Sequence, residues 1–110
     1  MKQSIENSYT RNTEEYLYPL ENTLNSVGKA AFLNLYPLVK KNLEITADEI
    51  EKEYPQYKKT MQTRLSSTRR IIKNGMAAEA LEIIAKSSRM SIAEQQTARM
   101  FLKELDNEIS

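Results

Sequence analysis

The chain has 110 residues, of which 40% are hydrophobic and 28% are charged, with a formal net charge of +1. This length and apolar content suit one domain, and we treat residues 1–110 as a single unit. Cysteine and histidine are both absent, which excludes disulfides, thiolate metal sites and nucleophiles activated by histidine. No apolar run approaches the ~20 residues that cross a bilayer, and the N-terminus lacks the apolar middle of a signal peptide. We therefore expect a cytoplasmic protein.

The first part of the chain predicts a weak start followed by two apolar helices. Residues 1–12 are polar, and we expect them to be frayed. The first apolar helix should end at Gly28, and Pro19 within it either begins a new helix or kinks the existing one. Residues 29–42 are the most apolar stretch and predict the helix that packs beneath the others. Pro37 leaves the same two alternatives open there.

The middle of the chain predicts two helices that meet at a tight turn. Thr46 is followed three residues later by Glu49, which is the spacing of a capping box, so a helix should begin at about Ala47. Pro55 should end this helix, because proline disfavours helical backbone at the residue before it. A second helix should run over about 58–73. Its apolar positions at helical spacing are Met61, Leu65 and Ile72, and Gly75 is a plausible C-terminal stop.

Charge distinguishes this second helix from an ordinary helical hairpin. The chain contains no acidic residue from Tyr54 to Ala78, whereas six basic residues lie in that stretch. These six are Lys58, Lys59, Arg64, Arg69, Arg70 and Lys73. Ten basic and fifteen acidic residues remain elsewhere. The total charge is therefore small, although residues 54–78 are strongly positive. Such a field favours association with a polyanion, and nucleic acid is the most obvious one.

These residues also resemble a known DNA-binding module. The relevant positions are Thr46, Ala47, Glu49 and Ile50 in the first helix, and Thr60, Met61, Arg64 and Leu65 in the second. Together they resemble the helix-turn-helix of winged-helix-like bacterial transcription regulators, over residues 45–75. Two features depart from that family. Thr68 replaces a usual apolar residue, and helical sequence follows Gly75 in place of the strands of a wing.

The resemblance implies a partner and a role for each polar residue of the helix 58–73. The partner would be double-stranded DNA, with this helix in the major groove. Side chains in its N-terminal half would contact bases, and the remaining basic side chains would contact phosphates. The predicted base contacts are Lys58, Lys59, Gln62, Thr63 and Ser66. The predicted phosphate contacts are Arg64, Arg69, Arg70 and Lys73.

The C-terminal part predicts two further helices. Residues 76–88 are rich in strong helix formers. Ser91 and Glu94 form a second possible capping box, and the helix after it should cover about 92–108. We expect a homodimer, because two half-sites give DNA affinity that one cannot. The predicted dimer contacts are Phe101, Leu102 and Leu105.

The predicted fold is all-α, a compact bundle of five or six short helices that contains the helix-turn-helix at about 46–74. Two other interpretations of the basic helix remain open. It can be an ordinary solvated surface, or it can dock on an acidic protein surface, as in a small inhibitor or adaptor encoded by a phage or another mobile element. We expect no enzyme, no metal and no cofactor, because no nucleophile with its base and no phosphate-binding glycine loop is present.

Overall fold

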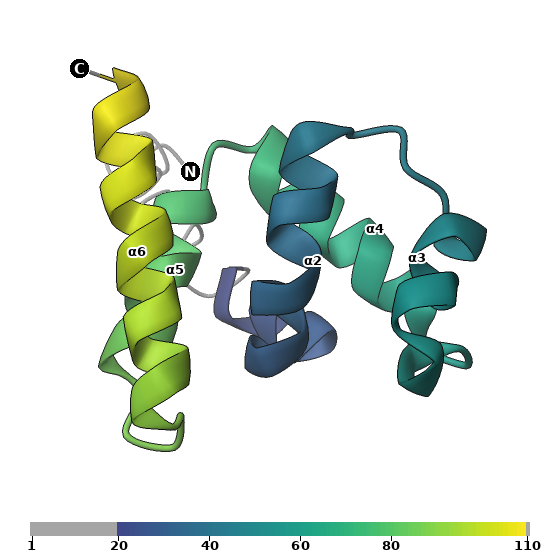
Figure 1. Ribbon diagram of the computed structural model, residues 1–110, viewed down its shortest axis with the longest axis horizontal. Helices are drawn as coiled ribbons and strands as arrows, with labels where there is room; N and C mark the ends of the chain where they lie inside the picture. The colour runs from purple at the N-terminus through teal and green to yellow at the C-terminus, as the bar shows by residue number, and fades with distance from the viewer. Residues whose placement is uncertain (1–19, 110) are drawn as a thin grey trace, which may run out of the picture.

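The apolar stripes of the sequence become the buried faces of short helices (Figure 1). The computed structural model describes residues 20–109. Six helices lie in this range, and no strand is found there, which confirms the all-α prediction. In chain order the elements are a helical segment over 20–27, α2 (Lys29–Lys41), α3 (Ala47–Glu53), the 3-10 turn η1 (Pro55–Tyr57), α4 (Met61–Lys73), α5 (Ala77–Lys86) and α6 (Ile92–Ile109). The predictions for residues 1–12 and for Pro19 lie outside the described residues.

Helix α2 lies at the centre of the molecule, as its apolar sequence predicts. Phe32, Leu35 and Val39 are completely buried. Helix α4 packs along α2, and α6 approaches α2 from the other end of the molecule. Pro37 lies inside the continuous helix and is exposed, so the alternative that it begins a helix is wrong. Burial of the surrounding apolar side chains offsets the ~3 kcal/mol that an interior proline costs.

Two glycines end helices with a positive φ. Gly75 (φ 72°) closes α4: the Met76 N–H donates to the Ile71 carbonyl, and the Gly75 N–H donates to the Ile72 carbonyl, both at 3.0 Å. This pair of bonds is the Schellman pattern. Gly28 (φ 88°) separates the segment 20–27 from α2. Both predicted helix ends are therefore confirmed.

The two predicted capping boxes also form. The Glu49 carboxylate accepts from the Thr46 N–H at 2.9 Å, and the Glu49 N–H donates back to the Thr46 hydroxyl at 3.3 Å. Ser91 and Glu94 make the same reciprocal pair, at 2.9 and 3.1 Å. Helices α3 and α6 therefore begin where the sequence predicted.

The predicted start of the basic helix was wrong. Pro55 opens the 3-10 turn η1, and residues 58–60 form a further turn, so α4 begins only at Met61. The Lys58 N–H donates to the Pro55 carbonyl at 3.1 Å, and the Thr60 N–H donates to the Tyr57 carbonyl at 2.9 Å. Each of these bonds joins an N–H to the carbonyl three residues earlier, as in a 3-10 turn, whereas an α-helix joins residues four apart. Residues 58–60 are therefore not part of the α-helix. The connection from α3 to α4 is therefore residues 54–60, longer than the three- or four-residue turn of a helix-turn-helix.

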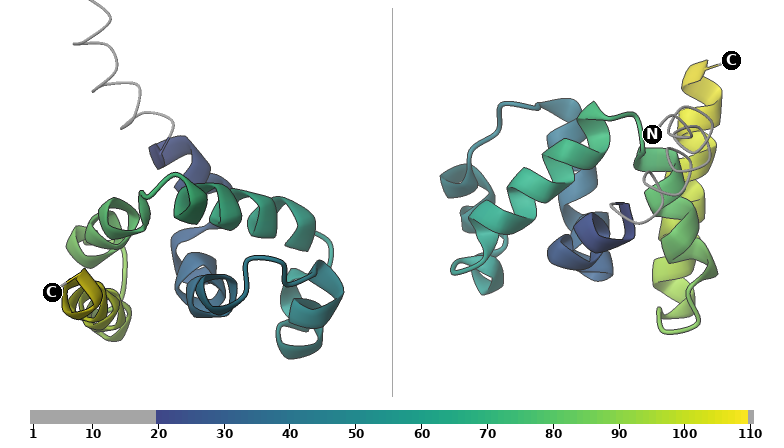
Figure 2. Two further views of the ribbon diagram at one scale, coloured as in Figure 1. Left: turned by 90° about the horizontal axis from the view of Figure 1, so that it is seen from above. Right: turned by 180° about the vertical axis from the view of Figure 1, so that it is seen from behind.

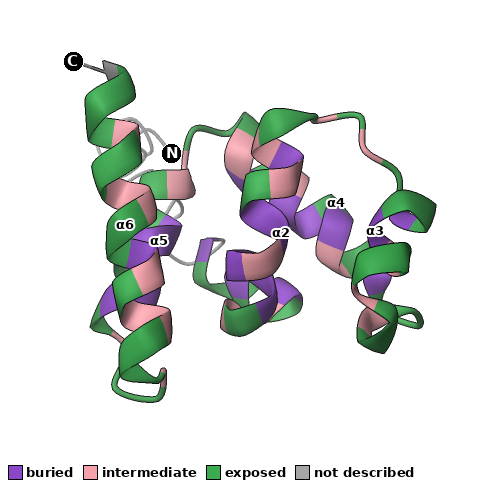
Figure 3. Cartoon of the chain, viewed as in Figure 1, coloured by how far each residue is buried: buried purple, intermediate pink, exposed green. Residues whose placement is uncertain are grey.

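The helices form two packing groups. In the first, α4 packs on α2, with α3 against α4 (Figures 1 and 2). In the second, α5 and α6 form a hairpin and pack mainly on each other. The buried residues of all these helices face inward between the ribbons (Figure 3).

Candidate nucleic-acid interface

Helix α4 has one buried and one exposed face, set by helical periodicity. Met61, Leu65, Thr68 and Ile71 are at most 2% exposed and face the core. The exposed side chains on the other face are Gln62, Thr63, Ser66, Arg70 and Lys73. Seen from behind, α4 lies across the molecule in front of α2 (Figure 2). The exposed face of α4 therefore forms part of the molecular surface.

Arg64, which was predicted to bind phosphate, makes hydrogen bonds within the protein. Its Nε donates to the Thr60 hydroxyl at 2.7 Å, and its Nη1 donates to the Val27 carbonyl. The guanidinium also lies over the Tyr57 ring, 4.8 Å from the ring centre. Tyr57 is itself fixed, because the Asn34 side-chain amide donates to its hydroxyl at 3.2 Å. Arg64 therefore ties α4 to the turn before it and to the end of the segment 20–27.

Arg69 is engaged in a similar way on another side of α4. Its Nε donates to the Leu43 carbonyl and its Nη2 to the Ile45 carbonyl, both at 2.6 Å. These carbonyls belong to the link between α2 and α3, and the side chain is half-buried. Two bonds from a planar guanidinium to neighbouring carbonyls fix the loop against α4. The predicted phosphate-binding roles of Arg64 and Arg69 conflict with these contacts.

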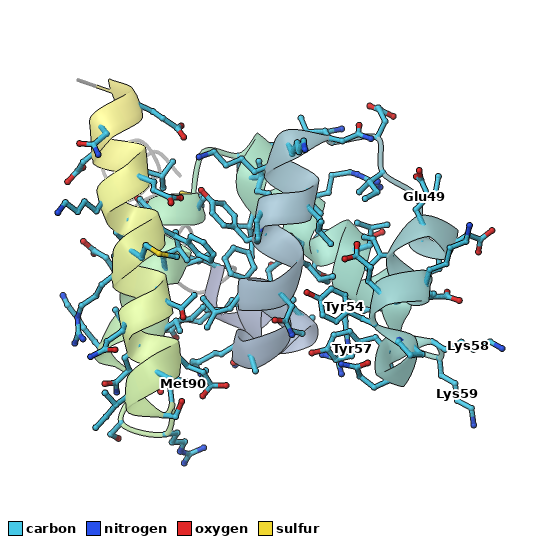
Figure 4. All side chains as sticks on the ribbon, in the orientation of Figure 1. Glu49, Tyr54, Tyr57, Lys58, Lys59 and Met90 are labelled. Atoms are coloured by element: carbon cyan, nitrogen blue, oxygen red, sulfur yellow. The ribbon has the colours of Figure 1, made fainter. Side chains whose placement is uncertain are left out.

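Four of the six basic residues that were predicted to contact DNA are exposed. Lys58 and Lys59 extend outward from the turn before α4, whereas Tyr54 and Tyr57 point back toward the protein (Figure 4). Arg70 and Lys73 lie on the outer face of α4 itself. The two lysines are thus not on the helix, as had been predicted, but immediately before its N-terminus. The four cations flank the uncharged polar residues Gln62, Thr63 and Ser66 along the chain.

Helix α3 adds negative charge beside this face. It carries four acidic residues and one lysine, and it packs against α4. The acidic residues are Asp48, Glu49, Glu51 and Glu53. The Thr46 N–H and hydroxyl hydrogen-bond to the Glu49 carboxylate and lower its pKa below the ordinary value. The acidic side chains of α3 therefore disfavour the approach of a polyanion to α3 itself.

The three predicted dimer contacts pack within the chain. Phe101, Leu102 and Leu105 are partly buried against the core, and the Phe101 ring lies 5.4 Å from the Tyr36 ring. Two other α6 side chains, Ile92 and Met100, are 72% and 51% exposed. The apolar residues that α6 offers to solvent are thus partly different from those predicted.

Sequence patterns had no means of finding the internal partners of Arg64 and Arg69. The carbonyls of Val27, Leu43 and Ile45 are backbone groups, 24 to 37 residues away along the chain. Any residue type would present the same carbonyl. Tyr57 carried a weak signal, since an aromatic residue before a basic helix can stack on a guanidinium.

A comparison with known protein families, curated proteins and solved structures finds no significant match. No helix within residues 20–109 is long and apolar enough to cross a membrane. Among the same residues, no three acidic side chains gather closely enough to hold a metal ion.

Proposed function

We propose that this chain is a small protein that binds duplex DNA with the outer face of α4, as a transcriptional regulator or accessory factor. The observation that carries the proposal is the exposed outer face of α4, together with the exposed Lys58 and Lys59 in the turn before it. This surface lies in a stretch without acidic residues. Arg64 and Arg69 hold the helix from its other sides, so the face is presented in a fixed orientation.

Within this proposal the exposed residues divide into two roles. Lys58, Lys59, Arg70 and Lys73 contact phosphates, which gives affinity without regard to sequence. Gln62, Thr63 and Ser66 lie between them and reach base edges, where amide and hydroxyl groups both donate and accept. Helix α4 has 13 residues and is thus about 20 Å long, enough to lie in the major groove.

We also propose that the protein forms a homodimer and lies in the cytoplasm. One helix of this size contacts a single short half-site, and a second copy doubles the phosphate contacts. The exposed Met100 and Ile92 of α6 are the apolar side chains from which a second copy would gain most on burial.

The proposal is tested by removing the four exposed cations together. We expect a variant with Lys58, Lys59, Arg70 and Lys73 all changed to Gln to bind random duplex DNA at least tenfold more weakly, as measured by fluorescence anisotropy. The matched control changes Lys41, Lys86, Arg89 and Lys103 to Gln, which removes the same charge from exposed positions elsewhere. The control should bind within about threefold of the unmodified chain, since those positions lie off the interface.

Equal losses in the two variants would contradict a specific interface on α4. Absence of DNA binding by the unmodified chain, even at low salt, would overturn the function itself. In that case an acidic protein surface becomes the better partner for the four cations.

A further inference from the structure

A single side chain, Arg64, contacts both of the residues that flank the exposed pair Lys58 and Lys59. On one flank the Arg64 guanidinium lies over the Tyr57 ring, 4.8 Å from the ring centre. On the other flank the Arg64 Nε donates to the Thr60 hydroxyl at 2.7 Å. The turn that carries the two lysines is therefore held at both ends by one residue of α4.

Hydrogen bonds within the turn join its two ends to each other. The Thr60 hydroxyl donates to the Tyr57 carbonyl at 3.4 Å, and the Thr60 N–H donates to the same carbonyl at 2.9 Å. The Lys58 N–H donates to the Pro55 carbonyl at 3.1 Å. These bonds restrain the backbone of Lys58 and Lys59, although both side chains are exposed.

Arg64, Tyr57 and Thr60 together form a clamp on the turn, and the clamp is attached to the core of the molecule. The Asn34 side-chain amide in α2 donates to the Tyr57 hydroxyl at 3.2 Å. The Arg64 Nη1 donates to the Val27 carbonyl at the end of the segment 20–27. The turn is thus positioned relative to α2 as well as to α4, and its two lysines extend outward (Figure 4).

We propose that Arg64 is a positioning residue that, through Tyr57 and Thr60, presents Lys58 and Lys59 to DNA phosphates. The inference rests on the proposed function, whose binding surface includes these two lysines. A turn that is ordered before binding loses less conformational entropy when its cations meet phosphates, so the same charges bind more tightly than on a loose segment. Arg64 therefore adds to affinity without itself contacting DNA.

A double-mutant cycle separates this role from a general loss of stability. Arg64→Lys keeps the positive charge but cannot lie flat on the Tyr57 ring while it donates to Thr60. We expect Arg64→Lys to weaken binding to random duplex DNA about three- to tenfold, as measured by fluorescence anisotropy at low salt. In a chain with Lys58 and Lys59 both changed to Gln, the same substitution should weaken binding less than about 1.5-fold.

The control for Arg64→Lys is Arg89→Lys, at an exposed position outside the interface. It should change affinity less than about 1.5-fold in either chain. Circular dichroism establishes that each variant is folded.

Thr60→Val tests the clamp a second way and serves should Arg64→Lys not fold. It removes only the hydroxyl, and the Thr60 side chain makes no capping bond that the change would also remove. We expect a loss of affinity of about two- to fivefold in the unmodified chain and no loss in the chain without the two lysines. The matched control is Thr97→Val in α6, where the lost bond to the Ala93 carbonyl lies outside the interface. It should leave affinity unchanged.

Backbone ¹⁵N order parameters of Lys58 and Lys59 measure the ordering of the turn without DNA. We expect values of about 0.85 in the unmodified chain and a fall toward about 0.6 in Thr60→Val. Unchanged order parameters would overturn the inference. So would unchanged affinity in both clamp variants, or equal losses with and without the two lysines, since equal losses indicate a merely structural role. These results would leave the proposed function standing, whereas absence of DNA binding by the unmodified chain would overturn the proposed function and the inference with it.

Discussion

Arg64 and Arg69 show that residues of one type on one helix can serve different purposes. Both were predicted to contact phosphate, yet both donate to backbone carbonyls of distant segments, whereas Arg70 is exposed. Periodicity did predict that Gln62 and Ser66 face away from Met61 and Leu65. It could not predict where each long side chain ends, because that depends on which carbonyls the fold brings within reach.

We expect Arg64→Lys to lower the free energy of unfolding by about 1–3 kcal/mol. Lysine keeps the charge but cannot donate to Thr60 and Val27 while lying flat on Tyr57. Urea denaturation followed by circular dichroism measures the change. Arg70→Lys, at an exposed position of the same helix, is the control and should leave stability unchanged within about 0.5 kcal/mol. Equal stability of the two variants would refute the structural role of Arg64.

Gly28 and Gly75 both have positive φ but differ in their surroundings. A Cβ at Gly28 would lie 2.8 Å from the Arg64 Nη1, whereas a Cβ at Gly75 would meet no described atom within 4 Å. We expect Gly75→Ala to cost about 1 kcal/mol from backbone strain alone, and Gly28→Ala to cost at least about 1 kcal/mol more. Thermal and urea unfolding of the two variants checks the order. The reverse order would show that Arg64 does not occupy this position.

At the scale of the helices, the sequence predicted those boundaries that local chemistry determines. The capping boxes at Thr46 and Ser91 and the stop at Gly75 depend on residues within one turn, and all three form as expected. The start of α4 was wrong by three residues. There, Pro55 begins a 3-10 turn, and contacts of Tyr57 with Asn34 and Arg64 hold it in place. The contact with Asn34 depends on tertiary structure, which a local pattern does not contain.

The capping box of α3 makes a prediction about pH. The folded pKa of Glu49 is lower than its ordinary value of 4.5, chiefly because the carboxylate accepts from the Thr46 N–H. A lowered folded pKa stabilises the protein above the unfolded pKa, and that stabilisation is lost as the pH falls through the folded pKa. The difference in unfolding free energy between the unmodified chain and Glu49→Gln should therefore be largest well above pH 4.5 and should shrink below it. Urea denaturation across this pH range measures it, and a constant difference would contradict the account.

For the whole molecule, composition and periodicity sufficed to predict an all-α fold. They did not predict that α5 and α6 form a hairpin, or that the Phe101 side of α6 packs toward Tyr36 of α2. The apolar side chains of an amphipathic helix can pack against the core of their own chain or against a second copy, and the same residue types suit both. Only the arrangement of the other helices decides between these two.

The position of Phe101 predicts the concentration dependence of stability. Phe101→Ala removes contacts within one chain, so it should lower the unfolding free energy by about 2–3 kcal/mol. The loss should be the same at every protein concentration. Urea denaturation over a hundredfold range of concentration measures this. A loss that appears only at high concentration would instead place Phe101 between two copies, as the sequence alone had suggested.

The most direct test of the DNA-binding account is the salt dependence of affinity for random duplex DNA, measured by fluorescence anisotropy from about 50 to 300 mM salt. Four exposed cations on phosphates predict that log affinity falls linearly with log salt, with a slope of about −3 to −4 per bound chain. The variant that lacks Lys58, Lys59, Arg70 and Lys73 should lose most of that slope. A slope near zero for the unmodified chain, or an unchanged slope in this variant, would contradict DNA binding by the face of α4.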